Sequence, residues 1–267
     1  MQNTLAIRYD HLTWPEIKAK VAEQPVVIIP VGVVEDHGHH LPVDTDNLLV
    51  TRICEAAAEK APGDILLMPS VFYGFSPHHM DFPGTISIEA DHFVEYVLDI
   101  TKSVAYHGFR RILLVNGHGS NAPLLNLVAR RTILETDAVC AAVSYWNLAS
   151  NVISELRESE IPGGICHACE LETSLYLFLC PERVQKDKIQ KEIKMPKGKF
   201  IWYDLVNPPS THLTLWWSQV TETGVVGDPT YASAEKGQRI FEACVKSLVE
   251  FSREFKSLEI GPRVDHH

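Results

Sequence analysis

The sequence predicts an α/β fold in which helices cover both faces of a mostly parallel sheet. Four short apolar runs rich in β-branched residues have the length and composition of buried strands: residues 26–33, 65–71, 112–115 and 139–144. Loops separate these runs from stretches whose apolar residues recur with helical periodicity: residues 47–60, 91–107, 121–134 and 232–251. Strands that alternate with helices at this spacing are typical of βαβ units.

The composition is that of a globular protein with a substantial core. Of the 267 residues, 45% are hydrophobic and 22% are charged, which excludes a disordered or collagen-like chain. Because the sequence has no internal repeat and no break in composition, we predict a single domain over residues 1–267. The segment 186–210 is rich in Lys and Pro without a clear period, so we expect an extended excursion on the surface.

The charge pattern argues against several kinds of partner. The net charge is −10 and the basic residues are scattered, so the surface repels phosphate backbones and nucleic-acid binding is not expected. No apolar run approaches the ~20 residues that span a bilayer, so no membrane partner is expected either. Residues 1–16 lack the features of a signal peptide, and the six cysteines are irregularly spaced. We therefore predict reduced thiols and a cytoplasmic protein.

Metal-ligating side chains follow the first predicted strand. Glu35 and His37 are two positions apart, so on an extended segment they point the same way. Asp46 lies at the entry to the next predicted helix. Carboxylates and imidazole are common ligands of Zn²⁺, Mn²⁺ and Fe²⁺. The alternative is a polar loop in which Asp46 caps a helix that begins at Asn47.

Two further clusters contain histidines. His118 lies between two glycines after the third predicted strand, where the backbone can turn sharply; the alternative is an exposed histidine in a tight turn. His167, Glu170 and Glu172 precede an apolar stretch, and a helix that begins near His167 would make His167 and Glu170 neighbours. Acids that stabilise a helix start would explain Glu170 but not His167. Three such clusters in one α/β chain favour a binuclear metal site.

The same clusters resemble the motifs of the creatininase family. Residues 35–46 resemble E-x-H-G-x-H-L-P-x-x-T-D, residues 116–121 resemble N-G-H-x-x-N, and residues 167–174 resemble H-A-G-E-x-E-T-S. Residues 82–87 and 224–229 also match family blocks, so the resemblance covers roughly residues 8–250. It implies a three-layer α/β/α fold, an assembly that is commonly hexameric, and two divalent ions per chain at the strand ends.

The resemblance also implies roles for individual residues. Glu35 and His118 would bind one ion, His37 would bind the other, and Asp46 would bridge both. His167 matches a histidine that is thought to shuttle protons. Side chains predicted to line the substrate pocket are His79, Ser120 and Trp146.

The sequence departs from creatininase at three places. Ser120 stands where creatininase has a carboxylate, so Glu172 becomes the candidate that completes the second ion's shell. Gly163 stands where creatininase has a tryptophan on a closing loop, and Gly119 replaces an aromatic residue. Because Gly163 and Gly164 are adjacent, we predict that this loop is mobile and makes no apolar contact with the substrate. Creatinine is therefore doubtful as the substrate, and another cyclic or linear amide fits as well.

Together these observations predict a metal-dependent hydrolase that cleaves a C–N amide bond of a small molecule with metal-activated water. One alternative is a binuclear phosphoester hydrolase, which would need Arg or Lys near the ligands, and none lies inside any cluster. Another is a non-catalytic metal-binding protein of the same fold. A homo-oligomer is also predicted. Four aromatic residues are candidate interface anchors: Trp202, Tyr203, Trp216 and Trp217. The alternative is that these four side chains belong to the core or to the pocket.

Overall fold

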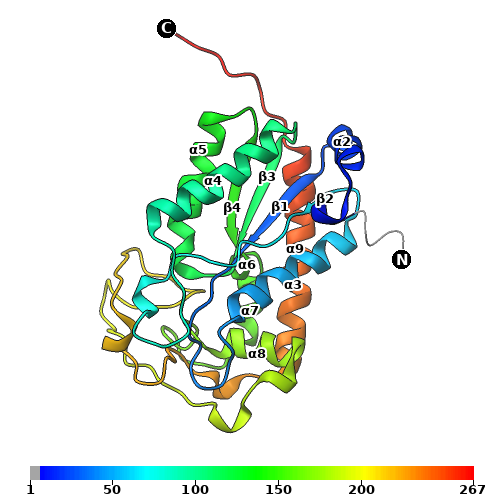
Figure 1. Ribbon diagram of the computed structural model, residues 1–267. Coiled ribbons are helices and arrows are strands. Elements are labelled where there is room, and N and C mark those ends of the chain that lie inside the picture. Colours follow the sequence, from blue (N-terminus) through cyan, green and yellow to red (C-terminus); the bar gives the residue numbers. More distant parts are fainter. Residues whose placement is uncertain (1–6) are drawn as a thin grey trace.

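The computed structural model describes residues 7–267 and contains one four-stranded sheet (Figure 1). All neighbouring strands pair in parallel, in the order β2-β1-β3-β4. The strands are β1 (Val26–Val31), β2 (Ile65–Leu67), β3 (Arg111–Asn116) and β4 (Val139–Ser144). The predicted parallel sheet is thus confirmed, with each of the four strands inside or within one residue of its predicted run.

Helices cover both faces of this sheet and make three layers. Figure 1 shows α4 (Ala90–Tyr106) and α5 (Ala122–Glu135) on one side of the strands, and α3 (Thr45–Lys60) and α9 (Ala234–Ser257) on the other. Each side has its own buried hydrophobic cluster. The remaining helices are α2 (Trp14–Glu23), α6 (Tyr145–Leu148), α7 (Ser150–Leu156) and α8 (Glu170–Leu179).

Strand β1 shows why the apolar runs are continuous. Val27 and Ile29 belong to the cluster beneath α4 and α5, whereas Val26 and Ile28 belong to the cluster beneath α3 and α9. Successive side chains of a strand point to opposite faces, so a strand that is buried on both faces must be apolar at every position. This explains why polar and apolar residues do not alternate along the strands in the sequence.

The structure differs from the predicted boundaries where the backbone makes close contacts. β1 ends at Val31 rather than Val33, and a Cβ on Gly32 would lie only 2.3 Å from Oδ1 of Asn47. This close approach requires a glycine where the chain leaves the sheet. Helix α2 was not predicted. Its signal is the capping box at its start, in which the backbone N–H of Thr13 donates to Glu16 over 2.7 Å.

All six cysteines are free, as predicted, and Cys169 and Cys244 are among the buried ones. Within residues 7–267, no helix combines the length and the apolar character that a membrane crossing requires.

The segment 186–210 is irregular, as predicted, but it is not confined to the surface. Met195 and Asp204 are buried, and the Asp204 carboxylate forms a two-point ion pair with Arg157 at 2.7 and 3.0 Å. Asp204 also accepts a hydrogen bond from the backbone of Gly163. The buried carboxylate of Glu192 accepts hydrogen bonds from the Thr221 hydroxyl at 2.7 Å and from the backbone N–H groups of residues 222 and 223.

Replacing Glu192 with glutamine is expected to destabilise the protein by about 1–3 kcal/mol at neutral pH, because the amide replaces a charged acceptor of several hydrogen bonds. Burial opposes ionisation, but the hydrogen bonds from Thr221 and Thr223 lower the pKa of Glu192 to about 2. The carboxylate therefore contributes stability above its ordinary pKa of 4.5, and this stability is lost as the pH falls towards 2. Urea unfolding at several pH values measures the difference, which should shrink in acid. Equal stability of both proteins at pH 7 would contradict this role.

Candidate metal centre

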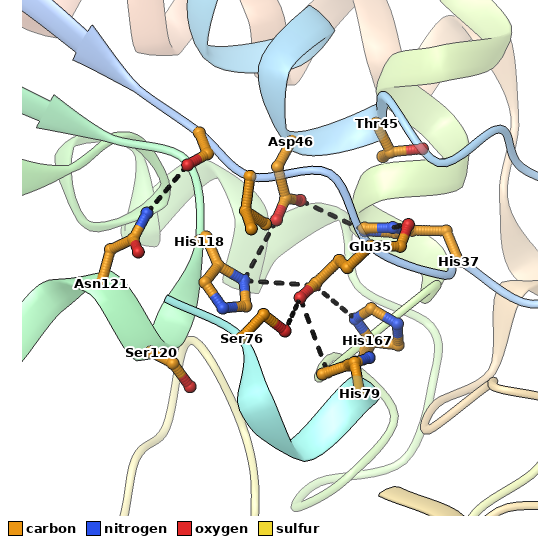
Figure 2. Close-up of polar contacts among 12 residues, drawn as sticks. Glu35, His37, Thr45, Asp46, Ser76, His79, His118, Ser120, Asn121 and His167 are labelled. Atoms are coloured by element: carbon orange, nitrogen blue, oxygen red, sulfur yellow. Dashed lines mark hydrogen bonds and ion pairs between the residues drawn. The ribbon is translucent and has the colours of Figure 1, made fainter. Parts of the chain in front are cut away.

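The predicted ligands meet beyond the carboxyl ends of β1 and β3, where α/β sheets commonly form sites (Figure 2). Glu35 and His37 follow β1, and His118 follows β3. Asp46 lies in the first turn of α3 and Glu172 lies in the first turn of α8. All five side chains are at most 6% exposed although four elements separated by long stretches of sequence supply them.

The first group of ligand atoms consists of Glu35, Asp46 and His118. Nδ1 of His118 lies 3.1 Å from Oε1 of Glu35 and 3.1 Å from Oδ2 of Asp46. The ligand atoms of all three residues lie within 4.8 Å of one another, a spacing that one ion can span.

The second group is arranged around His37. Its Nε2 lies 3.2 Å from Oδ1 of Asp46 and 3.7 Å from Oε1 of Glu172. Nδ1 of the same ring lies 3.3 Å from the backbone oxygen of Glu35 and donates to it in the tautomer that leaves Nε2 free. Asp46 therefore presents one carboxylate oxygen to each group, as expected of a bridging ligand.

The polar atoms of this centre fit a cation. Nε2 of His37 and Oδ2 of Asp46 are buried and have no hydrogen-bond partner within residues 7–267. Burial alone would lower the pKa of His118, but the attraction of Glu35 and Asp46 raises it to about 10. The pKa of His37 is likewise raised, against burial, by Asp46 and Glu172. Buried carboxylates that raise histidine pKa values favour positive charge, so a divalent ion suits this donor set.

Glu35 is oriented by a residue that sequence reasoning missed. The hydroxyl of Ser76 donates to Oε2 of Glu35 over 2.5 Å, and Ser76 is fully buried. This contact leaves Oε1 of Glu35 to face His118. Burial alone would raise the pKa of Glu35, yet nearby histidines, His118 first among them, hold it well below its usual value.

His79, which was predicted to line the pocket, lies at the centre and is oriented by Asp36. Nδ1 of His79 lies 2.7 Å from Oδ1 of Asp36, and Nε2 lies 3.8 Å from Oε2 of Glu35. Burial opposes ionisation of Asp36, but the nearby ring of His167 and the hydrogen bond with His79 lower its pKa to about 2. Asp36 is thus an ionised partner of His79 to which the sequence analysis gave no role.

His167 reaches the same centre from the segment before α8. Its Nε2 lies 2.8 Å from the backbone oxygen of Asp36, which makes Nε2–H the donor of this contact. Nδ1 then faces Oε1 of Glu35 at 3.6 Å, and the ring lies 4.3 Å from that of His37. The free nitrogen of His167 is therefore directed at the candidate ligands.

The two acids of the third cluster have different surroundings. Helix α8 begins at Glu170 rather than near His167, so His167 and Glu170 are not neighbours on a helix. The Glu170 carboxylate accepts hydrogen bonds from the backbone of residues 158 and 159 and pairs with Lys236, which is a structural role. One oxygen of Glu172 accepts from the backbone of Cys169 at 3.2 Å, and the other faces His37.

The other predicted pocket residues lie further from the ligands. Ser120 is half-buried, and its hydroxyl lies 3.3 Å from Nε2 of His78 (Figure 2 shows Ser120 apart from the ligand atoms). Burial, together with the charge of His79, lowers the pKa of His78 to about 3. Trp146 packs in the main hydrophobic cluster with its ring 5.1 Å from that of Tyr145, so its pocket role stays a prediction.

The glycines before His167 do not form a loosely packed loop. A Cβ on Gly164 would lie 2.5 Å from the side chain of Ser159, and the backbone N–H of Gly163 donates to Asp204 at 2.9 Å. The expected mobility is therefore not supported, because these glycines allow close packing. The absence of an apolar contact between these residues and a substrate stays a prediction.

Comparisons with known proteins identify the family of the chain. The family model "Creatininase: Creatinine amidohydrolase" matches residues 10–252. Creatinine amidohydrolase of Pseudomonas putida is 34% identical over 260 residues, which cover 91% of this chain and 95% of that protein. Mycofactocin precursor peptide peptidase of Mycobacterium ulcerans is 32% identical over 232 residues, which cover 84% and 83% of the two chains.

A solved structure described as "Creatininase Mn" has the same fold. It matches with a TM-score of 0.80 and 31% identity, and the match covers 93% of this chain and 98% of that one. The family model includes the ligand clusters after β1 and β3 and the one at the start of α8. The resemblance seen in the motifs is thereby confirmed, and the chain belongs to the creatininase family of amidohydrolases.

Proposed function

We propose that the protein is a hydrolase that cleaves a C–N amide bond of a small molecule with two divalent ions, within a single domain formed by residues 1–267. The observation that carries this proposal is the position of Asp46. Its two oxygens lie 3.2 Å from His37 and 3.1 Å from His118, so one carboxylate serves both groups of ligands. Such sharing is typical of two-metal hydrolytic sites.

Each ion has a proposed set of ligands. Glu35, Asp46 and His118 would hold one ion, and His37, Asp46 and Glu172 would hold the other. Ser120 supplies no carboxylate at its position, and Oε1 of Glu172 lies 3.7 Å from Nε2 of His37, which supports Glu172 as the substitute. Imidazole and carboxylate ligands suit Zn²⁺, Mn²⁺ or Fe²⁺.

The residues around the ions would complete the reaction. When two divalent ions are bound, they supply a hydroxide from water at neutral pH and polarise an amide carbonyl. Nδ1 of His167 would take up the proton that the attacking water loses and pass it to the departing nitrogen, because Nε2–H is held by the backbone of Asp36. Asp36 would keep Nδ1 of His79 protonated, so that Nε2 of His79 faces Glu35 and the substrate.

Hydrolysis of an amide panel by metal-depleted and metal-reconstituted protein tests this function. The panel should include creatinine, larger cyclic amides, linear amides and formamides. Turnover that returns with Mn²⁺, Zn²⁺ or Fe²⁺ is expected for at least one amide, with creatinine among the poor substrates. Full occupancy by metal without turnover of any amide would favour a non-catalytic metal-binding protein. Efficient turnover of creatinine would contradict the expected specificity.

A homo-oligomer, hexameric as the resemblance implies, is proposed as the working form. Exposed aromatic side chains support this assembly: Trp216 is 50% exposed and Phe200 is 59% exposed. Trp217, in contrast, is buried within its own chain at 6% exposure and packs in a small apolar cluster, so it does not support the interface. Light scattering at micromolar concentration distinguishes a monomer from a hexamer.

A further inference from the structure

The side chain of Trp217 lies against the histidines of the metal centre. Its ring centroid is 4.6 Å from that of His79, 5.1 Å from His78 and 5.7 Å from His167. His79 and His167 in turn face the two oxygens of Glu35, a proposed ligand. The indole of Trp217 therefore packs directly against the histidines that surround the proposed ligands.

Surrounding residues hold this indole in place. Trp217 begins a short 3₁₀ helix, Trp217–Gln219, and packs with Met195, Val220 and Val226 in a small cluster separate from the two main cores. The chain that follows is anchored by Glu192 through the hydrogen bonds from residues 221–223. With apolar groups on one side and the ring of His79 on the other, the indole is held in one position.

The polar atom of the indole lacks a partner. Nε1 of Trp217 is buried without a hydrogen bond to any residue of the described range 7–267. By comparison, Nε1 of Trp202 donates to the backbone oxygen of Asn207 over 2.8 Å. Nδ1 of His78, on the ring that meets Trp217 edge-on, is buried and unpartnered as well. Buried polar atoms without partners are costly and uncommon, so two such atoms next to the metal centre indicate a place for a ligand.

We propose that Trp217 contacts the substrate and sets its specificity, an inference that rests on the proposed amide hydrolysis. The edge of the indole that carries Nε1 would contact a planar part of the amide substrate, and Nε1–H would donate to a hydrogen-bond acceptor on that part. The substrate class is then an amide that carries a planar group with an uncharged oxygen or nitrogen acceptor.

Hydroxamates test the contact without requiring turnover, because their head group chelates divalent ions. Acetohydroxamate offers the head group alone, whereas benzohydroxamate adds a planar ring. In Mn²⁺-loaded protein, Trp217→Leu is expected to weaken benzohydroxamate binding at least about tenfold and acetohydroxamate binding by less than about threefold. Calorimetry measures both affinities. Trp216→Leu, at the half-exposed neighbouring position, is the matched control and should change neither.

The role of Nε1–H is tested by Trp217→Phe, which keeps an aromatic ring and removes the donor. The probes are the 3- and 4-pyridyl hydroxamates, whose ring nitrogen is an acceptor that benzohydroxamate lacks. Wild-type protein should bind at least one of them more tightly than benzohydroxamate, and the Phe variant should lose this preference. If the Phe variant keeps the preference for a pyridyl hydroxamate, or if the wild type lacks it, the proposed hydrogen bond from Nε1–H is contradicted.

The outcomes separate this inference from the function on which it rests. Equal losses for both hydroxamates in Trp217→Leu would show that Trp217 only supports the structure, and unchanged binding of both would show no contact at all; either result would overturn the inference. Wild-type protein that binds Mn²⁺ but not acetohydroxamate, or that binds no Mn²⁺, would overturn the proposed metal function itself.

Discussion

Replacing Asp46 with alanine is expected to remove both ions and to lower kcat/KM for amide hydrolysis by at least about a thousandfold. The reason is that Asp46 lies 3.1–3.2 Å from ligand nitrogens of both groups, so its loss deprives each ion of one anionic ligand. It also leaves His37 and His118 without the carboxylate that they share. Metal content per chain after gel filtration, together with kcat/KM, measures the effect.

A neighbouring aspartate provides the control for this variant. Asp44, two residues earlier, accepts a hydrogen bond from the Tyr176 hydroxyl at 2.9 Å and pairs with Arg183, away from the ligand groups. Asp44→Ala should therefore retain its metal even if it loses some stability. An Asp46→Ala protein that keeps two ions per chain would show that this carboxylate does not bridge them.

Replacing His167 with alanine is expected to lower kcat by about a hundredfold or more while the metal content stays unchanged. Nδ1 of His167 faces the centre while Nε2 is held by the backbone of Asp36, which is the arrangement expected of a proton donor. The loss should be smaller for amides whose leaving group is a weak base, because such a nitrogen departs without full protonation. Rates on anilides of graded basicity measure this dependence.

The metal content distinguishes the two roles open to His167. Its ligand atom lies within 4.8 Å of those of His37 and Glu172, so it is also close enough to bind metal. Loss of one ion in His167→Ala would assign it to the metal shell instead of to proton transfer. His39→Ala, at an exposed position of the same loop as His37, is the control and should change neither rate nor metal content.

The sheet and the ligands were predictable because they depend on local patterns. Apolar β-branched runs mark strands that are buried on both faces, and residues just beyond parallel strands meet at one edge of the sheet. This is why Glu35, His37 and His118 come together as expected. The position of Asp46, in the first turn of α3, could be predicted for the same reason.

The surroundings of the ligands were not predictable from such patterns. Ser76 precedes one short 3₁₀ turn and Trp217 begins another, in segments where no hydrophobic period indicates the path of the chain. The path of the segment after residue 186 depends instead on single buried contacts, such as those of Glu192 and Asp204 with distant backbone groups. Only the folded chain shows that Trp217 rather than Trp216 faces the histidines.

Anomalous X-ray diffraction from crystals grown with Mn²⁺ tests the central claim most directly. Two peaks per chain are expected about 3.5–4 Å apart, the usual separation in two-metal sites. One should lie between Glu35, Asp46 and His118, and the other between His37, Asp46 and Glu172. A single peak, or peaks that Asp46 does not contact, would contradict the proposed binuclear centre.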